Sequence, residues 1–225
     1  MITAFSTDRF ESYRAARGYD DARALALYVW NAEVCASFYL PLQTVEIGLR
    51  NTCHREMQRV YGNDWPLDPA FKGSDLSTHK QINEITGRLR AAAEKKNPPP
   101  PGKPFIFVPT TPQIVAGLGF GFWSFLLGKK YDRTYWRTAI HNSFPGYTTL
   151  HRHKISRGKA AETFGEIRNF RNRAFHHEPL FGRNSLRDDY DRLLEATRWI
   201  SEDLYLWLKS ESVNCDALIT KGPLV

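Results

Sequence analysis

The chain has 225 residues, 42% of them hydrophobic, and carries a formal net charge of +7 with a sequence pI near 9.4. This length and apolar content suffice for a core that folds on its own, and the positive charge favours a polyanionic partner. Three cysteines at wide spacings, with no Cys-x-x-Cys pair, argue against a disulfide framework and a zinc ribbon, so a reducing compartment is expected.

No stretch of the sequence has the composition of a signal peptide or a membrane span. The first residues, MITAFSTDRFESYR, lack the charged and then apolar run of a signal peptide. The longest apolar stretch, residues 114–127, is too short and too rich in glycine to cross a bilayer, and we expect it to be a buried core helix. The sequence therefore predicts a cytoplasmic protein without membrane contact.

The first half of the chain has the helical period. Apolar residues recur every three or four positions over residues 21–40, 42–60 and 77–97. Gly62 stands where the second of these helices should stop. The four prolines of residues 98–101 cannot continue a helix, so an extended, proline-rich connector is expected over residues 98–110.

The second half continues the pattern. Thr111 and Pro112 resemble the N-cap and first residue of a helix that runs through Leu127, in which glycines indicate close helix packing. Further helices are expected over residues 131–142, from 156 or 157 to 176, and from the capping pattern at Ser185 to about 209, which leaves 210–225 as a C-terminal tail. No segment alternates with period two. The sequence predicts one all-α domain over residues 1–225.

Residues 165–178, GEIRNFRNRAFHHE, concentrate arginine, asparagine and histidine as no other part of the chain does. Arg171, Asn172 and His176 are the candidate catalytic residues. An imidazole that titrates near neutrality can take the proton of a ribose 2′-OH or give one to a leaving 5′-oxygen, and a guanidinium can donate two hydrogen bonds to the phosphorane. Asn172 can orient the imidazole or hold a phosphate oxygen. These residue types suit RNA cleavage without a metal or other cofactor, because the internal 2′-OH is the nucleophile.

On one regular helix these side chains do not converge. Asn172 and His176 lie four residues apart on one face, whereas Arg171 lies about 140° from His176 around the axis. Two alternatives stay open: the helix unwinds before Pro179, or two chains each contribute part of the site. A simpler interpretation needs no catalysis, because arginines can be solvated charges and imidazolium is favourable at the negative end of a helix dipole.

The stretch Arg171–His176 resembles the Arg-polar-x3-His motif of HEPN domains, and RNRAFHHEP is similar to the RN-x-x-x-HHEP signature of the Abi-like (abortive infection) family. Two more blocks resemble that family in the same order. VEIGLRN, residues 45–51, is similar to its early helix motif, and FGFW, residues 120–123, is similar to its central block before the segment 131–136. The blocks span most of the chain from about residue 20 to residue 208.

The resemblance implies a HEPN-like helical bundle, pairing of two such domains around a shared cleft, and metal-independent ribonuclease activity against phage or self RNA. It implies catalytic roles for Arg171 and His176, a polar role for Asn172, and supporting roles for His177 and Glu178. A toxin of this kind implies an antitoxin or regulatory RNA as a further partner. Two alternatives are a non-catalytic RNA-binding or protein-interaction module of the same fold, and a subunit that acts with a nucleotidyltransferase partner.

Glu46, Arg50 and His54 follow one another at four-residue steps, with Asn51 alongside, so they share a helix face. One interpretation is an ordinary surface salt bridge between Glu46 and Arg50. The other is that Glu46, Arg50 and Asn51 support the Arg171 site, with Glu46 orienting an arginine.

Positive charge is concentrated around the candidate catalytic residues. Residues 151–187 hold nine Lys or Arg against three Glu, a net of +6, whereas residues 188–225 have a net charge of −4. The pair His151 and His153 lacks a nearby carboxylate or cysteine to complete a metal site, which makes phosphate contact the better interpretation. RNA contacts are expected from Lys154, Arg157, Lys159, Arg168 and Arg173, unless the first three pair with Asp188, Asp189 and Asp191.

Overall fold

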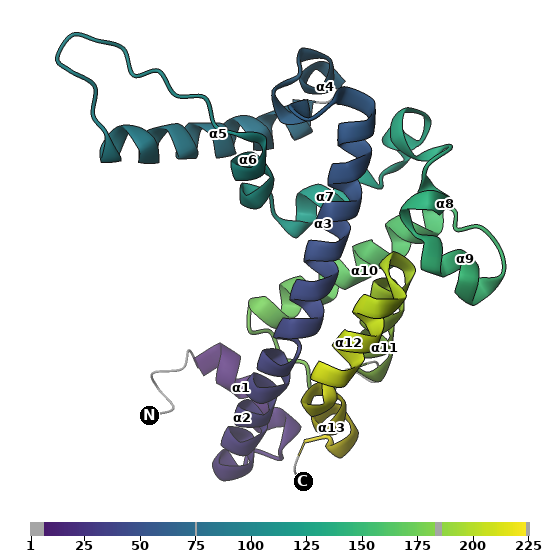
Figure 1. Ribbon diagram of the computed structural model, residues 1–225. Helices are drawn as coiled ribbons and strands as arrows, with labels where there is room; N and C mark the ends of the chain where they lie inside the picture. Colours follow the sequence, from purple (N-terminus) through teal and green to yellow (C-terminus); the bar gives the residue numbers. More distant parts are fainter. Residues whose placement is uncertain (1–6, 75, 183–185, 224–225) are drawn as a thin grey trace. The chain divides into compact units, whose positions relative to one another are not determined.

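The structure is a computed structural model that describes residues 7–74, 76–182 and 186–223, without the side chains of residues 7, 72–74 and 76. In these residues the regular secondary structure is entirely helical, which confirms the all-α prediction (Figure 1). The chain divides into two compact units, residues 1–45 with 165–225 (unit 1) and residues 46–164 (unit 2). The division falls within two helices, α3 (Tyr39–Tyr61) and α10 (Arg157–Phe175). The single domain expected from the sequence stays a prediction.

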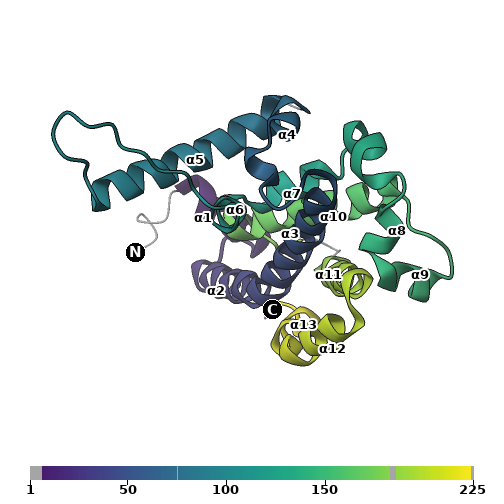
Figure 2. The same ribbon diagram turned by 45° about the horizontal axis from the view of Figure 1, so that its top comes forward.

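Unit 1 is built from the two ends of the chain. Its aromatic core includes Phe38, whose ring meets Phe170 edge-on at a centroid distance of 4.7 Å. α2 begins at the N-cap Asp20, whose carboxylate accepts the Arg23 N–H. In Figures 1 and 2, α11 and α12 run side by side, and α13 packs against both α2 and α11. Besides parts of α3 and α10, the helices of unit 1 are α1 (Thr7–Ala16), α2 (Asp21–Ser37), α11 (Leu186–Ile200), α12 (Glu202–Glu211) and α13 (Val213–Lys221).

Unit 2 is organised around tryptophans. The Trp65 ring packs edge-on against Phe71 at 4.7 Å, and the Trp123 and Trp136 indoles donate hydrogen bonds to the carbonyls of Leu118 and Leu126. Besides parts of α3 and α10, its helices are α4 (Pro69–Ser74), α5 (Leu76–Lys96), α6 (Thr111–Gly117), α7 (Phe120–Leu126), α8 (Ile140–Ser143) and α9 (Pro145–His151), with 3-10 turns at Trp65–Leu67 and Lys129–Tyr131 and a π-helical turn at Asp132–Trp136.

The expected single helix over residues 111–127 is wrong, because the chain becomes extended at Leu118 and Gly119 between α6 and α7. Its N-cap is Thr110 rather than Thr111, and the Thr110 N–H donates to the side chain of Gln113. The segment is nevertheless buried core, as expected. A Cβ on Gly117 would lie 2.7 Å from Ile85, so at this glycine the predicted close packing is confirmed. At Gly119 and Gly121 the prediction is wrong, because a Cβ there would meet no atom within 4 Å.

Three further helix predictions need correction. The helix expected over residues 131–142 is a π-helical turn followed by the short α8, and Pro145 begins α9 instead of only ending its predecessor. The long helix expected to reach about residue 209 breaks at Ser201, whose hydroxyl accepts the Leu204 N–H and caps α12. The C-terminal tail is largely helical, as α13. Ser185, the expected cap of α11, lies outside the described residues.

The expected stop at Gly62 is confirmed: this residue follows the last residue of α3 with a positive φ of 81°, a conformation that glycine adopts at little cost. Residues 98–110 contain no helix or strand and join α5 to α6. They are not extended throughout, because Pro101 and Gly102 form a turn in which the Lys103 N–H donates to the Pro100 carbonyl at 3.1 Å. Among the described residues, no helix combines the length and the apolar character that crossing a bilayer requires.

Candidate functional site

The candidate catalytic residues lie at the C-terminal end of α10, in unit 1. The His176 N–H donates to the Asn172 carbonyl at 2.9 Å, which continues the helical bonding to His176. The His177 N–H then donates to Ala174 and the Glu178 N–H to Arg173, while His177 takes a left-handed φ of 56°. This pair of bonds is a Schellman motif, with histidine at the position where glycine is usual.

A second element holds this helix end in place. The Arg9 guanidinium, from α1, donates to the carbonyl oxygens of His176 at 2.7 Å and His177 at 3.0 Å. Carbonyls at a helix C-terminus lack partners within the helix and carry its negative dipole end, so a cation is favourable there. Farther along, the Leu180 N–H donates to the buried Asn31 side chain at 2.6 Å. The chain on both sides of His177 is therefore fixed by contacts within unit 1.

The three candidate side chains have different surroundings. Asn172 and His176 are exposed, whereas Arg171 is half-buried. The Arg171 guanidinium lies over the Phe175 ring, 4.6 Å from its centroid, and that ring meets Tyr39 edge-on at 5.9 Å. A guanidinium over an aromatic face keeps its charge and has a defined position. Arg171 is therefore oriented, while the side chain of His176 is exposed to solvent.

The bonding of α10 bears on the two geometric alternatives. The helix does stop before Pro179, as expected, yet the departure from helical geometry starts at His177, one residue beyond His176. Arg171 and His176 thus stay about 140° apart around the axis, the value for five residues of a regular helix. Unwinding within this chain therefore does not bring the two side chains together, and the two-chain site stays a prediction.

The neighbouring residues have structural partners. Glu178 forms an ion pair with Arg173 at 3.4 Å, and Arg173 also donates to the Pro179 carbonyl at 3.2 Å. His177 is the left-handed residue of the helix end, and its expected supporting role stays a prediction. Arg168 is half-buried on α10, and its role as an RNA contact stays a prediction.

The residues expected to support the site from α3 lie in unit 2. Glu46 and Arg50 are half-buried and Asn51 is exposed. Their support of Arg171 stays a prediction. His54, on the same helix, accepts a 2.9 Å hydrogen bond at Nδ1 from the Trp65 indole. Burial lowers the pKa of His54 below its usual value, and the nearby charges of Arg50 and Arg55 lower it further.

Lys154, Arg157 and Lys159 form the basic run of unit 2, and acidic neighbours pair with two of these three residues. Arg157 donates to the Leu127 carbonyl at 2.7 Å and pairs with Asp132 at 3.4 Å, while Lys159 pairs with Glu162 at 3.5 Å. Lys154 is exposed. Arg157 therefore helps to hold unit 2 together, and its expected contact with RNA stays a prediction, as do those of Lys154 and Lys159.

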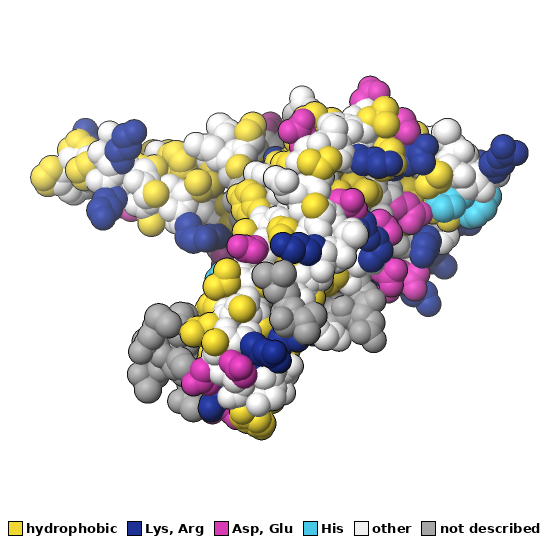
Figure 3. Space-filling model, turned by 90° about the horizontal axis from the view of Figure 1, so that it is seen from below, with side chains coloured by type: hydrophobic (Ala, Val, Ile, Leu, Met, Phe, Trp, Pro, Cys, Tyr) yellow, Lys and Arg dark blue, Asp and Glu magenta, His cyan; other side chains and the backbone are white. Residues whose placement is uncertain are grey.

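The histidines next to this run form an aromatic group. The rings of His151 and His153 lie 5.9 Å apart, and Tyr147 lies 4.3 and 5.4 Å from them. Figure 3 shows histidine side chains gathered over the region of α9, beside Lys and Arg side chains. In the described part of the chain, no group of three or more His, Cys, Asp or Glu residues is placed to hold a metal ion.

No family model, curated protein or solved structure matches the chain. The description of the candidate site therefore rests on the contacts and exposure of this chain's own residues. Arg9 is the contributor that sequence reasoning missed, because nothing in the pattern around residue 9 signals a contact 167 positions away.

Proposed function

We propose that this chain is a metal-independent endoribonuclease of the toxin or phage-defence (abortive infection) type, with a HEPN-like helical bundle, that acts on RNA in the cytoplasm. The observation that carries the proposal is the placement of the Arg-Asn-x-x-x-His motif. His176 and Asn172 are exposed at a helix end that Arg9 and the Schellman motif hold in position, and Arg171 is oriented on Phe175. An exposed, well-positioned imidazole suits proton transfer to and from a large substrate.

The proposed reaction uses only groups of the protein and the RNA. His176 takes the proton of a ribose 2′-OH as the 2′-oxygen attacks the adjacent phosphorus, and the bond from phosphorus to the 5′-oxygen breaks. The imidazolium formed on His176 gives its proton to the departing 5′-oxygen, directly or through water, so the products are a 2′,3′-cyclic phosphate and a 5′-hydroxyl and His176 is neutral again. Arg171 donates hydrogen bonds to the phosphorane oxygens, and Asn172 holds a phosphate oxygen or orients His176.

A working site in this proposal needs two copies of the chain. Arg171 and His176 face directions about 140° apart on one regular helix, so a single α10 does not present both to one phosphate. A homodimer that brings two copies of this helix end to a shared cleft pairs the Arg171 of one copy with the His176 of the other. An antitoxin or regulatory RNA that occupies this cleft would keep the activity in check.

The direct experiment compares two neighbouring histidines. Purified protein is incubated with a labelled single-stranded RNA, and cleavage by His176→Ala is compared with cleavage by His177→Gly. The second variant also removes an imidazole, but glycine accepts the left-handed conformation at that position. We expect His176→Ala to lose about 10²- to 10⁴-fold in rate and His177→Gly, at a supporting position, to lose much less. Full activity of a folded His176→Ala variant rules the proposal out. If the wild-type protein cleaves RNA while light scattering shows a monomer at the assay concentration, the paired site is ruled out.

A further inference from the structure

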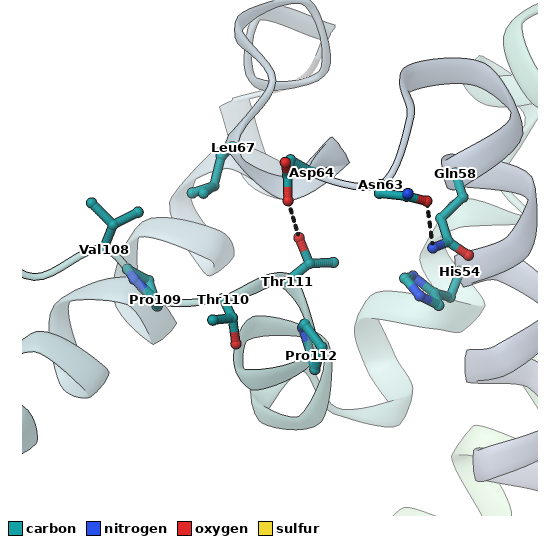
Figure 4. Close-up of a pocket in the computed structure, with 10 residues that line it drawn as sticks. All are labelled: His54, Gln58, Asn63, Asp64, Leu67, Val108, Pro109, Thr110, Thr111 and Pro112. Carbon is teal, nitrogen blue, oxygen red and sulfur yellow. Dashed lines mark hydrogen bonds between the residues drawn. The ribbon is translucent and has the colours of Figure 1, made fainter.

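A polar pocket lies in unit 2 and shares no residue with the motif on α10. It has a volume of about 460 Å³, within the range of about 300–1,000 Å³ that is typical of small-ligand sites. Figure 4 shows His54 and Gln58 on the α3 side and the end of the connector with the start of α6 on the other side. Asn63 and Asp64, which follow α3, complete the polar wall.

Internal hydrogen bonds fix the polar groups that a ligand would meet. The His54 Nδ1 accepts from the Trp65 indole at 2.9 Å, so the neutral ring carries its proton on Nε2 and presents a donor. The Gln58 amide donates to the Asn63 carbonyl oxygen at 3.2 Å, which leaves Gln58 an acceptor oxygen and Asn63 an NH₂ donor. The Thr111 hydroxyl donates to one Asp64 oxygen at 3.2 Å, and the second carboxylate oxygen remains as an acceptor.

The pocket is also electrically asymmetric. At one end burial, and after it the charges of Arg50 and Arg55, lower the pKa of His54 and favour the neutral ring. At the other end Asp64 supplies a carboxylate. The pocket thus places the donors of His54 and Asn63 and the carboxylate acceptor of Asp64 around one space. The arrangement suits a neutral, dipolar molecule with acceptors on one side and paired N–H donors on the other.

Guanine has this distribution of groups. Its O6 and N7 are acceptors, and its N1–H and 2-amino group form an adjacent pair of donors. A carboxylate can accept from both donors at once, while His54 Nε2–H and the Asn63 amide can donate to the acceptors. Proline and aliphatic side chains, among them Pro109, Pro112 and Leu67, supply apolar wall for a flat ring. We propose that this pocket binds a guanine base, with Asp64 reading N1–H and the 2-amino group and with His54 and Asn63 on the acceptor side.

This inference does not require the chain to cleave RNA, so it is tested by binding alone. Guanosine, inosine and adenosine monophosphates are titrated into the full chain, and the NMR signal of the Trp65 indole N–H reports on the pocket through its bond to His54. We expect guanosine monophosphate to bind roughly 5- to 150-fold more tightly than adenosine monophosphate, the range for loss of one bidentate base contact. Inosine monophosphate, which lacks the 2-amino group, should fall between them.

The matched variants are Asp64→Asn and Asp68→Asn. In the first, the new amide keeps an oxygen for Thr111 but loses the second acceptor, so the difference between guanosine and inosine monophosphate should vanish. Asp68 accepts the N–H groups of Ala70 and Phe71, does not line the pocket, and can be replaced by asparagine as a helix cap. Equal binding of the three nucleotides with displacement by inorganic phosphate overturns the proposal in favour of phosphate binding. Binding of N-acetyl-arginine amide instead of any nucleotide overturns it in favour of a peptide, and unchanged preference in Asp64→Asn overturns the role of Asp64.

Discussion

Arg9 and His176 lie 167 positions apart in the sequence, and the Arg9 guanidinium donates a 2.7 Å hydrogen bond to the His176 carbonyl. The same guanidinium reaches the His177 carbonyl at 3.0 Å. Through these bonds, α1 fixes the helix end on which the proposed catalytic imidazole stands. α1 is thereby tied to the candidate site although it contributes no candidate catalytic residue.

We expect Arg9→Met to lower the free energy of unfolding by about 0.3–1 kcal/mol, because two C-terminal carbonyls of α10 lose a cationic donor. Chemical denaturation measures this loss. The matched control is Arg23→Met, which removes an exposed arginine at the start of α2 that sits 3.9 Å from Asp20. If both variants lose the same free energy of unfolding, the bonds from Arg9 to the end of α10 stabilise the fold no more than an exposed ion pair does.

His177→Gly should stabilise the protein by roughly 1 kcal/mol, because a left-handed φ of 56° strains a residue with a Cβ and does not strain glycine. His177→Val should be destabilising for the same reason. Arg152→Gly, at a left-handed φ of 57° at the end of α9, is a comparison that should shift in the same direction as His177→Gly. Thermal unfolding followed by circular dichroism decides the sign. Destabilisation by His177→Gly would show that the imidazole makes contacts that outweigh the backbone strain.

The sequence identified the helical character of the chain because apolar periodicity reflects burial. α2, α3, α5 and α10 were expected within a few residues of their observed bounds. Apolar periodicity did not reveal a helix end where the apolar pattern continues across the break between two helices. The apolar pattern continues through Ser201 and through Gly119. Ser201 nevertheless caps a new helix, and extended backbone at Leu118 and Gly119 separates α6 from α7. α1, which has almost no apolar stripe, went unpredicted, and so did α13.

The candidate site was predictable only in its chemistry. Arg171, Asn172 and His176 stand out by residue type, and the helix end near Pro179 follows from the proline. The left-handed conformation of His177 and the contact from Arg9 depend on tertiary structure, so no local sequence pattern predicts them. The pocket at Asp64 was missed as well, because its residues come from three separate segments of unit 2 and no motif spaces them.

Protonation of His54 should destabilise the fold. Burial, then Arg50 and Arg55, lower its pKa below the usual 6.5, so the unfolded chain binds more protons than the folded one. The contribution to stability is complete above pH 6.5 and is lost as the pH falls through 6.5 towards the lowered value. An imidazolium also loses the Nδ1 acceptor for Trp65. His54→Asn keeps an acceptor and does not titrate, so its melting temperature should fall less than that of the wild type between about pH 8 and about pH 5.5. Parallel curves for the two proteins would contradict this assignment.

RNA binding by the basic run should depend on Lys154 and Lys159. Lys154→Gln with Lys159→Gln should reduce the salt slope of single-strand binding by up to about 1.4, since each phosphate contact contributes about 0.7. Arg157 is left in place because it bonds to the Leu127 carbonyl. The control removes the same charge from Lys95 and Lys96, which are exposed at the end of α5. Filter binding at several salt concentrations measures the slope. Equal slopes in the two double variants would place the RNA elsewhere.

The most direct measurement maps the ends of RNA fragments produced by the purified chain in the presence of EDTA. Attack by the internal 2′-OH predicts fragments with 2′,3′-cyclic phosphate and 5′-hydroxyl ends, formed without a divalent ion. The same fragments should be absent with Arg171→Ala or His176→Ala, each losing about 10²- to 10⁴-fold in rate while keeping its helical circular dichroism. Cleavage that both folded variants retain, 5′-phosphate ends, or no cleavage of any RNA by the wild-type chain would contradict the account.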